Sequence, residues 1–358
     1  MVNVLGLDIG GANTKAAFMV VRDGQVVEFK SELEYFPFWK RDADQFKSLL
    51  AELKNKLCRS ENLDGVGVTM TAELSDAYRT KREGVNHVLD CVAEVFGESR
   101  VMVLDVDAKL CSIVAAKSEP LKVASANWAA TGWMVALHIC DCVVVDVGST
   151  SASIIPIVNG AVAASGKTDL EKLANGELVY TGSLRTNVAA TVQVVSLRGR
   201  NVRVASELFA QSGDVHLVLG NITAEDYTVD TADGKEKTRP AALARLARVV
   251  CADVEMLSEQ EITQIAKYVY DRQVVQIAYG LNQVYDRFDQ KTRKELPTVV
   301  TGLGQEFLAR KAAEKAGVTK ILSLNSLLPK GAALASPAVG VALRMATKLE
   351  GKRIVWKP

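Results

Sequence analysis

The sequence predicts an α/β protein built from two duplicated lobes with a cleft between them. The chain opens the same way twice, because residues 4–10 read VLGLDIG and residues 142–148 read CVVVDVG. In each copy a second apolar run follows and ends in a two-residue turn, Asp23-Gly24 or Asn159-Gly160. Asp-Gly and Asn-Gly between apolar runs are strong hairpin signals. A chain of 358 residues is also long enough for two domains, each with its own core.

The order of apolar segments supports the α/β class in the first half. Residues 42–57 and 83–96 carry apolar side chains at helical spacing and predict two helices. Residues 65–69 and 101–104 are short apolar runs that predict buried strands. We expect a further helix over Leu110–Ala116.

The second half shows the same alternation. Residues 222–240 are rich in turn residues and predict a loop, whereas helical patterns dominate from Pro240 to about Phe288. Residues 298–301 predict a strand, followed by a glycine turn and a helix over 306–315. Ser336 before Pro337 predicts the N-cap and first position of a last helix.

Composition excludes several function classes. The 43 basic and 42 acidic residues give a net charge of +1, which does not favour a nucleic-acid or membrane surface as partner. No apolar run reaches the length of a membrane span, and the N-terminus does not read as a signal peptide, so we expect a cytoplasmic protein. The six cysteines lack C-x-x-C spacing, which favours reduced thiols. An assembly of identical chains is left open.

The two bends that carry Asp-X-Gly have the chemistry of phosphate sites. Glycines let a ligand approach the main chain, and turn N–H groups can converge on phosphate oxygens. Neighbouring hydroxyl groups and the Lys15 ammonium add further donors. Asp8 and Asp146 would repel phosphate directly, so their presence predicts Mg²⁺ between carboxylate and phosphate, held mostly through water.

Four segments resemble the motifs of the actin, sugar-kinase and Hsp70 ATPase superfamily. They are Asp8–Gly11 with Thr14-Lys15, Asp146–Thr150, Thr301–Gly304, and Gly331–Ala333 followed by the helix from Ser336. The resemblance implies two actin-like (ribonuclease H-like) lobes, the first over 1–136 and completed by a C-terminal helix at 336–350, the second over 137–333. The phosphate-binding residues that it implies are Gly10, Gly11, Asn13, Thr14, Lys15, Gly148, Ser149, Thr150, Ser153, Gly302 and Gly304.

Longer segments resemble one family within this superfamily. They are residues 69–85, Ala126–Thr131, residues 180–186 and Asp230–Gly234. Together they are similar to the hydantoinase/oxoprolinase-like family described as tetrahydromethanopterin-linked C1 transfer pathway proteins, whose archaeal members are the methanofuran-biosynthesis synthases. The resemblance covers nearly the whole chain. It implies that a furanmethanol diphosphate bearing an aminomethyl group is joined to γ-glutamyltyramine, forming an aryl ether and releasing diphosphate.

Such a reaction needs a base for the phenol proton and donors for the departing diphosphate. Lys15 is expected to contact the diphosphate. Glu73, Asp76, Asp105 and Asp107 are candidate bases, and the sequence does not choose among them; Asp105 and Asp107 could instead cap a helix, and the other two could be surface charges.

Substrate contacts are expected from three further residues. Thr71 lies in a matched segment, Trp128 (with Trp133) could stack on the furan or phenol ring, and Arg185 could bind the glutamyl carboxylate. Simple packing for the tryptophans and a surface position for the arginine are the alternatives.

Two other functions fit the same fold. An ATP-dependent small-molecule kinase, or a hydantoinase/oxoprolinase-like ATPase, would use the Thr301–Gln305 turn for adenosine; a non-catalytic ATPase regulator would only open and close on nucleotide. The long matched segments favour the synthase, with Mg²⁺ as cofactor and ATP possible but not favoured.

Overall fold

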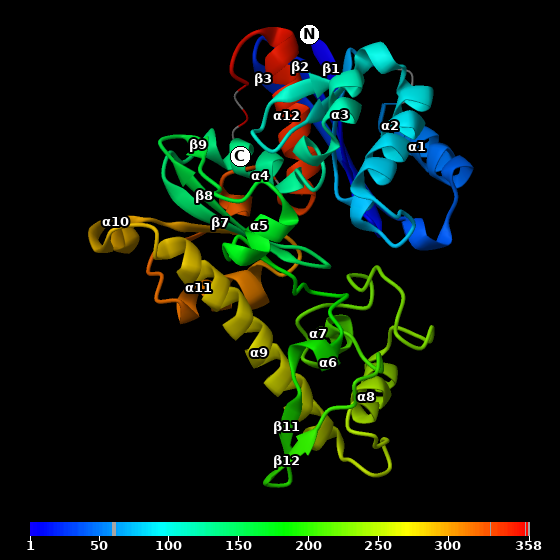
Figure 1. Cartoon of the computed structure of the whole chain (residues 1–358), viewed down its shortest axis with the longest axis vertical. Coiled ribbons are helices and arrows are strands. Elements are labelled where there is room, and N and C mark those ends of the chain that lie inside the picture. Colours follow the sequence, from blue (N-terminus) through cyan, green and yellow to red (C-terminus); the bar gives the residue numbers. More distant parts are fainter. Residues whose placement is uncertain (59–61, 330, 355, 357–358) are drawn as a thin grey trace. The chain divides into compact units, whose positions relative to one another are not determined.

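The computed structural model describes residues 1–58, 62–329, 331–354 and 356 (Figure 1). By compactness the chain divides into unit 1, which holds Met1–Val144, Ile155–Lys172 and Leu322–Pro358, and unit 2, which holds Val145–Ile154 and Leu173–Ile321. Over the described residues we find no helix with both the length and the apolar character needed to cross a lipid bilayer.

Unit 1 is built on a six-stranded sheet in the order β3-β2-β1-β4-β5-β6. Its strands are β1 (Val2–Ile9), β2 (Asn13–Arg22), β3 (Gln25–Tyr35), β4 (Gly65–Met70), β5 (Val101–Leu104) and β6 (Leu110–Ser112). Its helices are α1 (Ala43–Cys58), α2 (Lys81–Phe96), α3 (Ile113–Ser118), α4 (Asn127–Ala136) and α12 (Ser336–Glu350). The expected helices at 42–57 and 83–96 are confirmed as α1 and α2.

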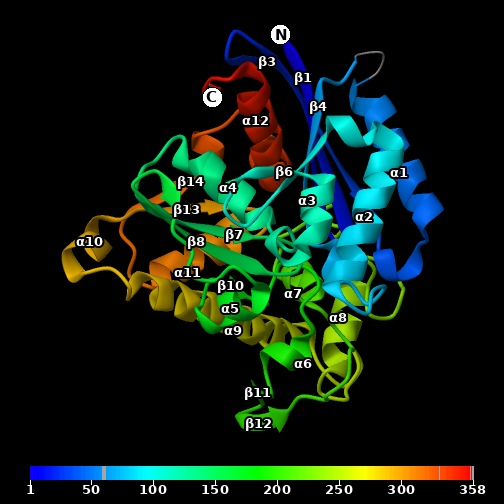
Figure 2. The same cartoon turned by 45° about the horizontal axis from the view of Figure 1, so that its top comes forward.

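Helices cover both faces of this sheet, as Figure 2 shows. Successive strand residues point to opposite faces. Leu5, Leu7 and Ile9 of β1 share one buried cluster with Phe46 of α1 and Val88 of α2. The alternate residues of β1 face α12, so the side chain of Asp8 lies on the α12 face of the sheet.

Glycines let α12 approach the sheet closely. A Cβ built on Gly6 would lie 2.0 Å from the carbonyl oxygen of Ala338, and one on Gly67 would lie 2.8 Å from that of Val341. On the helix itself, a Cβ on Gly340 would lie 2.4 Å from the carbonyl oxygen of Ala130 in α4. Real atoms do not approach so closely, so helix and sheet meet backbone to backbone at these positions.

A second sheet has the order β10-β8-β7-β13-β14, and β9 pairs with β8. Its strands are β7 (Cys142–Val147), β8 (Ala152–Val158), β9 (Ala161–Val162), β10 (Leu178–Val179), β13 (Thr298–Thr301) and β14 (Ile321–Ser323). A separate hairpin joins β11 (Val194–Leu197) to β12 (Arg200–Arg203), and the short helix α5 (Asp169–Ala174) follows β9.

The helices of unit 2 gather on one long helix, α9 (Glu259–Tyr285), which is drawn in yellow in Figure 1. The others are α6 (Val188–Thr191), α7 (Ser212–Val218), α8 (Arg239–Arg248), α10 (Gln290–Glu295) and α11 (Arg310–Lys315). Of these, α6, α7, α8 and α11 all contact α9. The expected loop over 222–240 is confirmed up to Thr238, after which α8 begins.

Both turns that marked the duplication adopt the conformation their sequences predict. Asp23 and Gly24 have φ of 51° and 80°, and Asn159 and Gly160 have 52° and 71°. Two successive positive φ values are what a tight hairpin turn between twisted strands requires. The turns join β2 to β3 and β8 to β9, so each repeat of the sequence forms three consecutive strands.

Two expectations about element boundaries were wrong. Leu110–Ser112 forms strand β6, which pairs antiparallel with β5, and the helix α3 begins only at Ile113. The pairing follows because Ala108, at φ 57°, reverses the chain directly after β5. Ser336 is not the N-cap of α12: a short 3₁₀ turn at Ala333–Ala335 runs into the helix, so Ser336 is already helical.

Candidate functional site

The first glycine turn joins β1 to β2 at one end of the unit 1 sheet. The Gly10 N–H donates to the Asn13 carbonyl oxygen at 2.9 Å, and a Cβ on Gly10 would lie 2.7 Å from that oxygen. The turn therefore has room only for glycine. Thr71 is beside it, because its N–H donates to the Ile9 carbonyl oxygen at 2.9 Å and its hydroxyl is 3.6 Å from the Cβ position on Gly10.

Polar side chains form a row across three strands next to this turn. Asp8 of β1 is opposite Lys15 of β2 and Thr69 of β4, so the three side chains share the α12 face. The Lys15 Nζ is 3.5 Å from the Asp8 carboxylate, which is only 4% exposed. Thr14 is buried and lies opposite Ile9, so its hydroxyl points to the other face of the sheet.

The oxygen atoms of this row could supply some, but not all, of the ligands of a hard cation. The Asn13 Oδ1 and Thr69 Oγ1 are buried and accept no hydrogen bond from the residues described, and the Asp8 carboxylate lies between their strands. Such oxygens are the ligands that Mg²⁺ prefers. Among the described residues no group of three or more His, Cys, Asp or Glu side chains could hold a metal ion. A cation here would need water and phosphate oxygens to complete its shell.

In unit 2 the second glycine turn is wrapped by the segment around Arg185. The N–H groups of Ser183 and Leu184 donate to the carbonyl oxygens of Gly148 and Ser149, each at 2.9 Å. The Arg185 Nη1 donates to the Thr150 hydroxyl at 3.3 Å. Arg185 therefore belongs to the turn predicted to bind phosphate. This contact was not expected, since the sequence suggested either the substrate's carboxylate or solvent as the partner of Arg185.

The third glycine motif packs on the same turn. The Gly304 N–H donates to the Val147 carbonyl oxygen at 2.9 Å. Gly302 has φ 87°, and a Cβ there would lie 2.6 Å from the Asp146 Oδ1. The structure thus brings Asp146, Gly148, Arg185, Gly302 and Gly304 together within unit 2.

A π-helical turn, Gln305–Ala309, follows this motif directly. Such turns are frequent at functional sites. Ser153, in contrast, lies inside β8 opposite Leu178 and outside the glycine turn.

The four candidate bases have very different surroundings. Asp76 is exposed. Asp105 accepts the N–H groups of Asp107 and Lys109 at 2.9 and 2.8 Å, so it closes the turn after β5. Asp107 is half exposed and lies 2.7 Å from Lys167, whose hydrogen bond lowers the pKa of the Asp107 carboxyl. A turn residue and two solvated carboxylates are poor bases for a buried phenol.

Glu73, in contrast, is 2% exposed and belongs to a polar cluster within unit 1. The Ser125 Oγ is 2.6 Å from the Glu73 Oε1 and 2.6 Å from the Asp169 Oδ2. The Lys81 Nζ is 2.7 Å from the Asp169 Oδ2, 3.1 Å from the Ser125 Oγ and 3.6 Å from the Glu73 Oε1. We call Glu73, Lys81, Ser125 and Asp169 the Glu73 cluster.

The hydrogen bonds of this cluster require one extra proton. A serine hydroxyl has one hydrogen and can donate to only one of the two carboxyl groups that contact it at 2.6 Å. The other contact is a hydrogen bond only if that carboxyl is protonated. Burial raises the pKa of Glu73, while Asp169 is closer to the Lys81 ammonium. The raised pKa favours Glu73 as the carboxyl that carries the proton, with Ser125 donating to Asp169.

Sequence reasoning missed three members of this cluster. Ser125 is 52 positions from Glu73, and Asp169 is 44 positions beyond Ser125. Ser125 has φ 53°, which is unusual for a residue other than glycine and is often found at functional sites. No short motif announces such a contact, although Lys81 and Ser125 lie in or beside segments that carried the family resemblance.

The rings of Trp128 and Trp133 each lie against a cationic side chain. Trp128 is buried, and the Lys172 Nζ lies 3.9 Å from its ring centroid. The Arg344 guanidinium lies 5.0 Å from the ring centroid of Trp133. Each ring thus has a cation–π partner within unit 1.

Comparison with known proteins places these residues in a family. Residues 64–347 match the hydantoinase/oxoprolinase family. The chain is 38% identical over 348 residues to the (4-{4-[2-(gamma-L-glutamylamino)ethyl]phenoxymethyl}furan-2-yl)methanamine synthase of Methanocaldococcus jannaschii, covering 97% of this chain and 98% of that one. It is 37% identical over 214 residues to the synthase of the same name from Methanococcus vannielii, covering 59% of this chain and 94% of that one.

The fold agrees with these matches. The nucleotide-free structure of an acetone carboxylase aligns with a TM-score of 0.58 at 11% identity, over 96% of this chain and 70% of that one. The predicted actin-like α/β fold is confirmed, while the lobe boundaries and the cleft stay predictions. The chain belongs to the hydantoinase/oxoprolinase family, in the branch that contains the archaeal methanofuran-biosynthesis synthases.

Proposed function

We propose that this chain catalyses the ether-forming step for which its relatives are named. A phenol oxygen, that of γ-glutamyltyramine, attacks the CH₂ carbon of an aminomethyl-furanmethanol diphosphate. The C–O bond to diphosphate breaks, and diphosphate leaves with its electron pair. The observation that carries the proposal is 38% identity over 97% of the chain to a curated synthase.

The departing diphosphate needs positive charge and donors. In unit 1 we assign this role to Lys15 and the Gly11 N–H, since the Gly10 N–H already donates to the Asn13 carbonyl oxygen. In unit 2 we assign it to the turn at Gly148 with Arg185. Asp8 and Asp146 would hold Mg²⁺ mostly through water. When bound, the ion would offset the charge on the leaving group.

The Glu73 cluster supplies a base through a relay. The phenol proton passes to the Glu73 Oε2, a buried atom that accepts no hydrogen bond from the residues described. Glu73 gives its own proton through Oε1 to the Ser125 Oγ, and Ser125 gives its proton to the Asp169 Oδ2. Asp169 is the group that ends protonated. Lys81 orients the Asp169 carboxylate through the 2.7 Å contact between its Nζ and the Asp169 Oδ2.

Product should form without nucleotide. We expect Mg²⁺-dependent release of diphosphate in step with ether formation when the chain is incubated with the two substrates, and no change when ATP is added. The measurement is product by mass spectrometry and diphosphate by enzymatic assay, with EDTA as the control. If product appears only with ATP and ADP accumulates in step, the chain is a kinase-type enzyme of the same fold.

Glu73→Gln should separate activity from stability in a pH-dependent way. Because burial raises the folded-state pKa of Glu73, the folded chain holds this proton more tightly than the unfolded chain does. The wild type must therefore lose stability as the pH rises above the ordinary glutamate pKa, until the folded-state pKa is reached. Gln is neutral at every pH, so the melting temperature of the variant should rise relative to wild type between pH 5 and pH 8.

The same variant should lose most of its ether-forming activity, because an amide cannot relay the proton. The exposed Asp76→Asn is the matched control and should change neither property. An active Glu73→Gln variant whose melting temperature follows that of wild type at both pH values would remove Glu73 from the mechanism.

A further inference from the structure

Unit 1 contains a cavity, lined by several cationic side chains, that no step of the proposed reaction uses. It has a volume of about 590 Å³ and lies where α4, β6 and the end of α12 meet. Its ten lining residues are Lys109, Leu110, Trp133, Leu137, Arg344, Thr347, Lys348, Gly351, Lys352 and Arg353. Five of them are cationic and none is acidic, so the cavity concentrates positive charge.

These cations have few carboxylate partners. Lys352 lies 3.7 Å from Glu350, which does not line the cavity. For Lys109, Arg344, Lys348 and Arg353 we find no carboxylate within 4.0 Å among the residues the structure describes. Since like charges at neighbouring positions of a helix repel, Arg344 and Lys348 at a spacing of four destabilise α12 slightly.

The C-terminal end of α12 does not account for all five cationic residues of the cavity. The dipole of α12 favours cations in its last turn and just beyond its C-cap, which explains Lys348 and Lys352 respectively. It does not explain Lys109, which comes from the turn before β6, or the concave shape. Two guanidinium groups are also fixed in place: the Arg344 Nε donates to the Ala108 carbonyl oxygen at 2.9 Å, and Arg353 donates to that of Leu137.

The apolar part of the lining limits what would bind. Trp133, Leu110 and Leu137 line the same cavity, and Arg344 stacks on the Trp133 ring at 5.0 Å. Inorganic phosphate alone would leave these apolar residues without a partner. We propose that this cavity binds a small organic polyanion that carries two or more phosphate or carboxylate groups on an apolar body.

The test is calorimetric titration of the full chain with ATP and with an aromatic tricarboxylate, benzene-1,3,5-tricarboxylate, both in EDTA. Lys109→Gln/Lys348→Gln removes two exposed cations from the cavity, and Lys267→Gln/Lys315→Gln removes two exposed lysines from α9 and α11 at the same cost in net charge. We expect at least one probe to bind and the first pair to weaken it about tenfold or more, while the second pair leaves it unchanged. Binding should also weaken as salt rises.

Two further arms separate this site from the proposed active site. Lys15→Met should leave the titration unchanged, since Lys15 does not line the cavity. Trp133→Phe should remove any change in tryptophan fluorescence on binding. Preference for either probe supports the proposal and identifies the anionic group. The proposal is overturned if neither probe binds more tightly than ~1 mM, or if the two lysine pairs behave alike.

Discussion

We expect Asp8→Asn to slow ether formation by about 100-fold, which corresponds to about 2.7 kcal/mol of lost transition-state stabilisation. The substitution keeps the size and shape of a side chain that is only 4% exposed. It removes the charge that would hold Mg²⁺ opposite the leaving diphosphate, and a lost metal contact is worth several kcal/mol at such a site. Asp146→Asn should behave in the same way in unit 2. The stability of each variant should change by about 1 kcal/mol or less.

The dependence on Mg²⁺ separates the roles of Asp8 and Lys15. Raising Mg²⁺ should recover part of the rate in Asp8→Asn, because a weaker site fills at higher concentration. Lys15→Met should also be slow, but Mg²⁺ should not rescue it, since the ammonium is proposed to contact diphosphate directly. Rates are measured against Mg²⁺ concentration, and the rise in melting temperature on adding Mg²⁺ with diphosphate gives a readout independent of turnover.

Asp23→Asn is the matched control for these variants. This variant makes the same replacement of a carboxylate by an amide, but at an exposed hairpin turn. Asp23 has φ 51°, a conformation that Asn also tolerates well. It should alter neither rate nor Mg²⁺ dependence. Near-normal rates and unchanged Mg²⁺ dependence in Asp8→Asn would assign this carboxylate a structural role.

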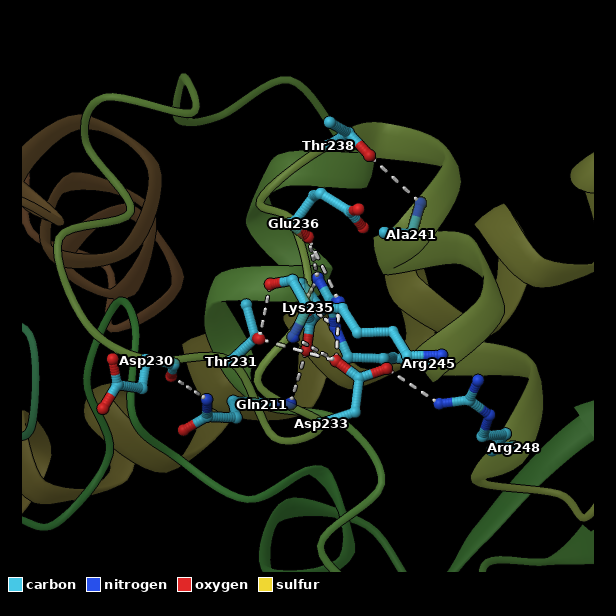
Figure 3. A network of polar contacts seen from close by, with 11 residues as sticks. Gln211, Asp230, Thr231, Asp233, Lys235, Glu236, Thr238, Ala241, Arg245 and Arg248 are labelled. Carbon is cyan, nitrogen blue, oxygen red and sulfur yellow. Dashed lines mark hydrogen bonds and ion pairs between the residues drawn. The ribbon is translucent and has the colours of Figure 1, made fainter.

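Arg245→Met should unfold unit 2 more readily than any exposed substitution. Arg245 and Asp214 are both fully buried and lie 2.8 Å apart, and the guanidinium also contacts Asp233 at 3.1 Å. Figure 3 shows the side chain of Arg245, from α8, pointing toward the Asp233 carboxylate. The Arg248 side chain donates to the same carboxylate. Removing one partner of a buried ion pair costs about 3–5 kcal/mol, because the other charge stays buried without compensation.

The loss should depend on pH in a defined direction. Burial already raises the pKa of Asp214, and the Arg245 guanidinium opposes that effect. Without Arg245 the carboxyl of the folded variant would stay protonated to higher pH than in the unfolded chain. The variant should therefore lose more stability at pH 8 than at pH 5, as measured by denaturant titration.

Two companion variants make this prediction specific. Arg245→Met/Asp214→Asn removes both charges and should recover part of the stability, because Asn can still accept the Gln211 N–H that Asp214 now accepts at 2.9 Å. Arg248→Met breaks the half-exposed pair with Asp233 and should cost about 1 kcal/mol or less. Equal losses in Arg245→Met and Arg248→Met would show that burial does not set the strength of this network.

Sequence patterns predicted those elements whose conformation is set by residues close together in the sequence. Helical stripes located α1 and α2, and the Asp23-Gly24 and Asn159-Gly160 turns located both repeats. The strand β6 was missed because its three residues are defined by pairing with β5 rather than by a pattern of their own.

The site was predicted unevenly for the same reason. Glycine motifs marked the turns that we propose to bind phosphate, since a backbone without a Cβ has a local signature. The choice of Glu73 among four carboxylates needed its burial and its contact with Ser125, which is 52 positions away. Arg185 was predicted to be a site residue. Its hydrogen bond to Thr150 could not be predicted, because the two residues are 35 positions apart in the sequence.

The close packing of α12 has a consequence for synthesis of the chain. The sheet residues Gly6 and Gly67 meet Ala338 and Val341, which leave the ribosome long after the strands of this sheet. Until then the α12 face of the first sheet has no cover, and exposed apolar strands of this kind invite aggregation. Unit 1 therefore completes its fold only after residues 336–350 are available, although its first six strands emerge early. A truncation that removes residues 336–350 should leave nascent chains dependent on chaperones.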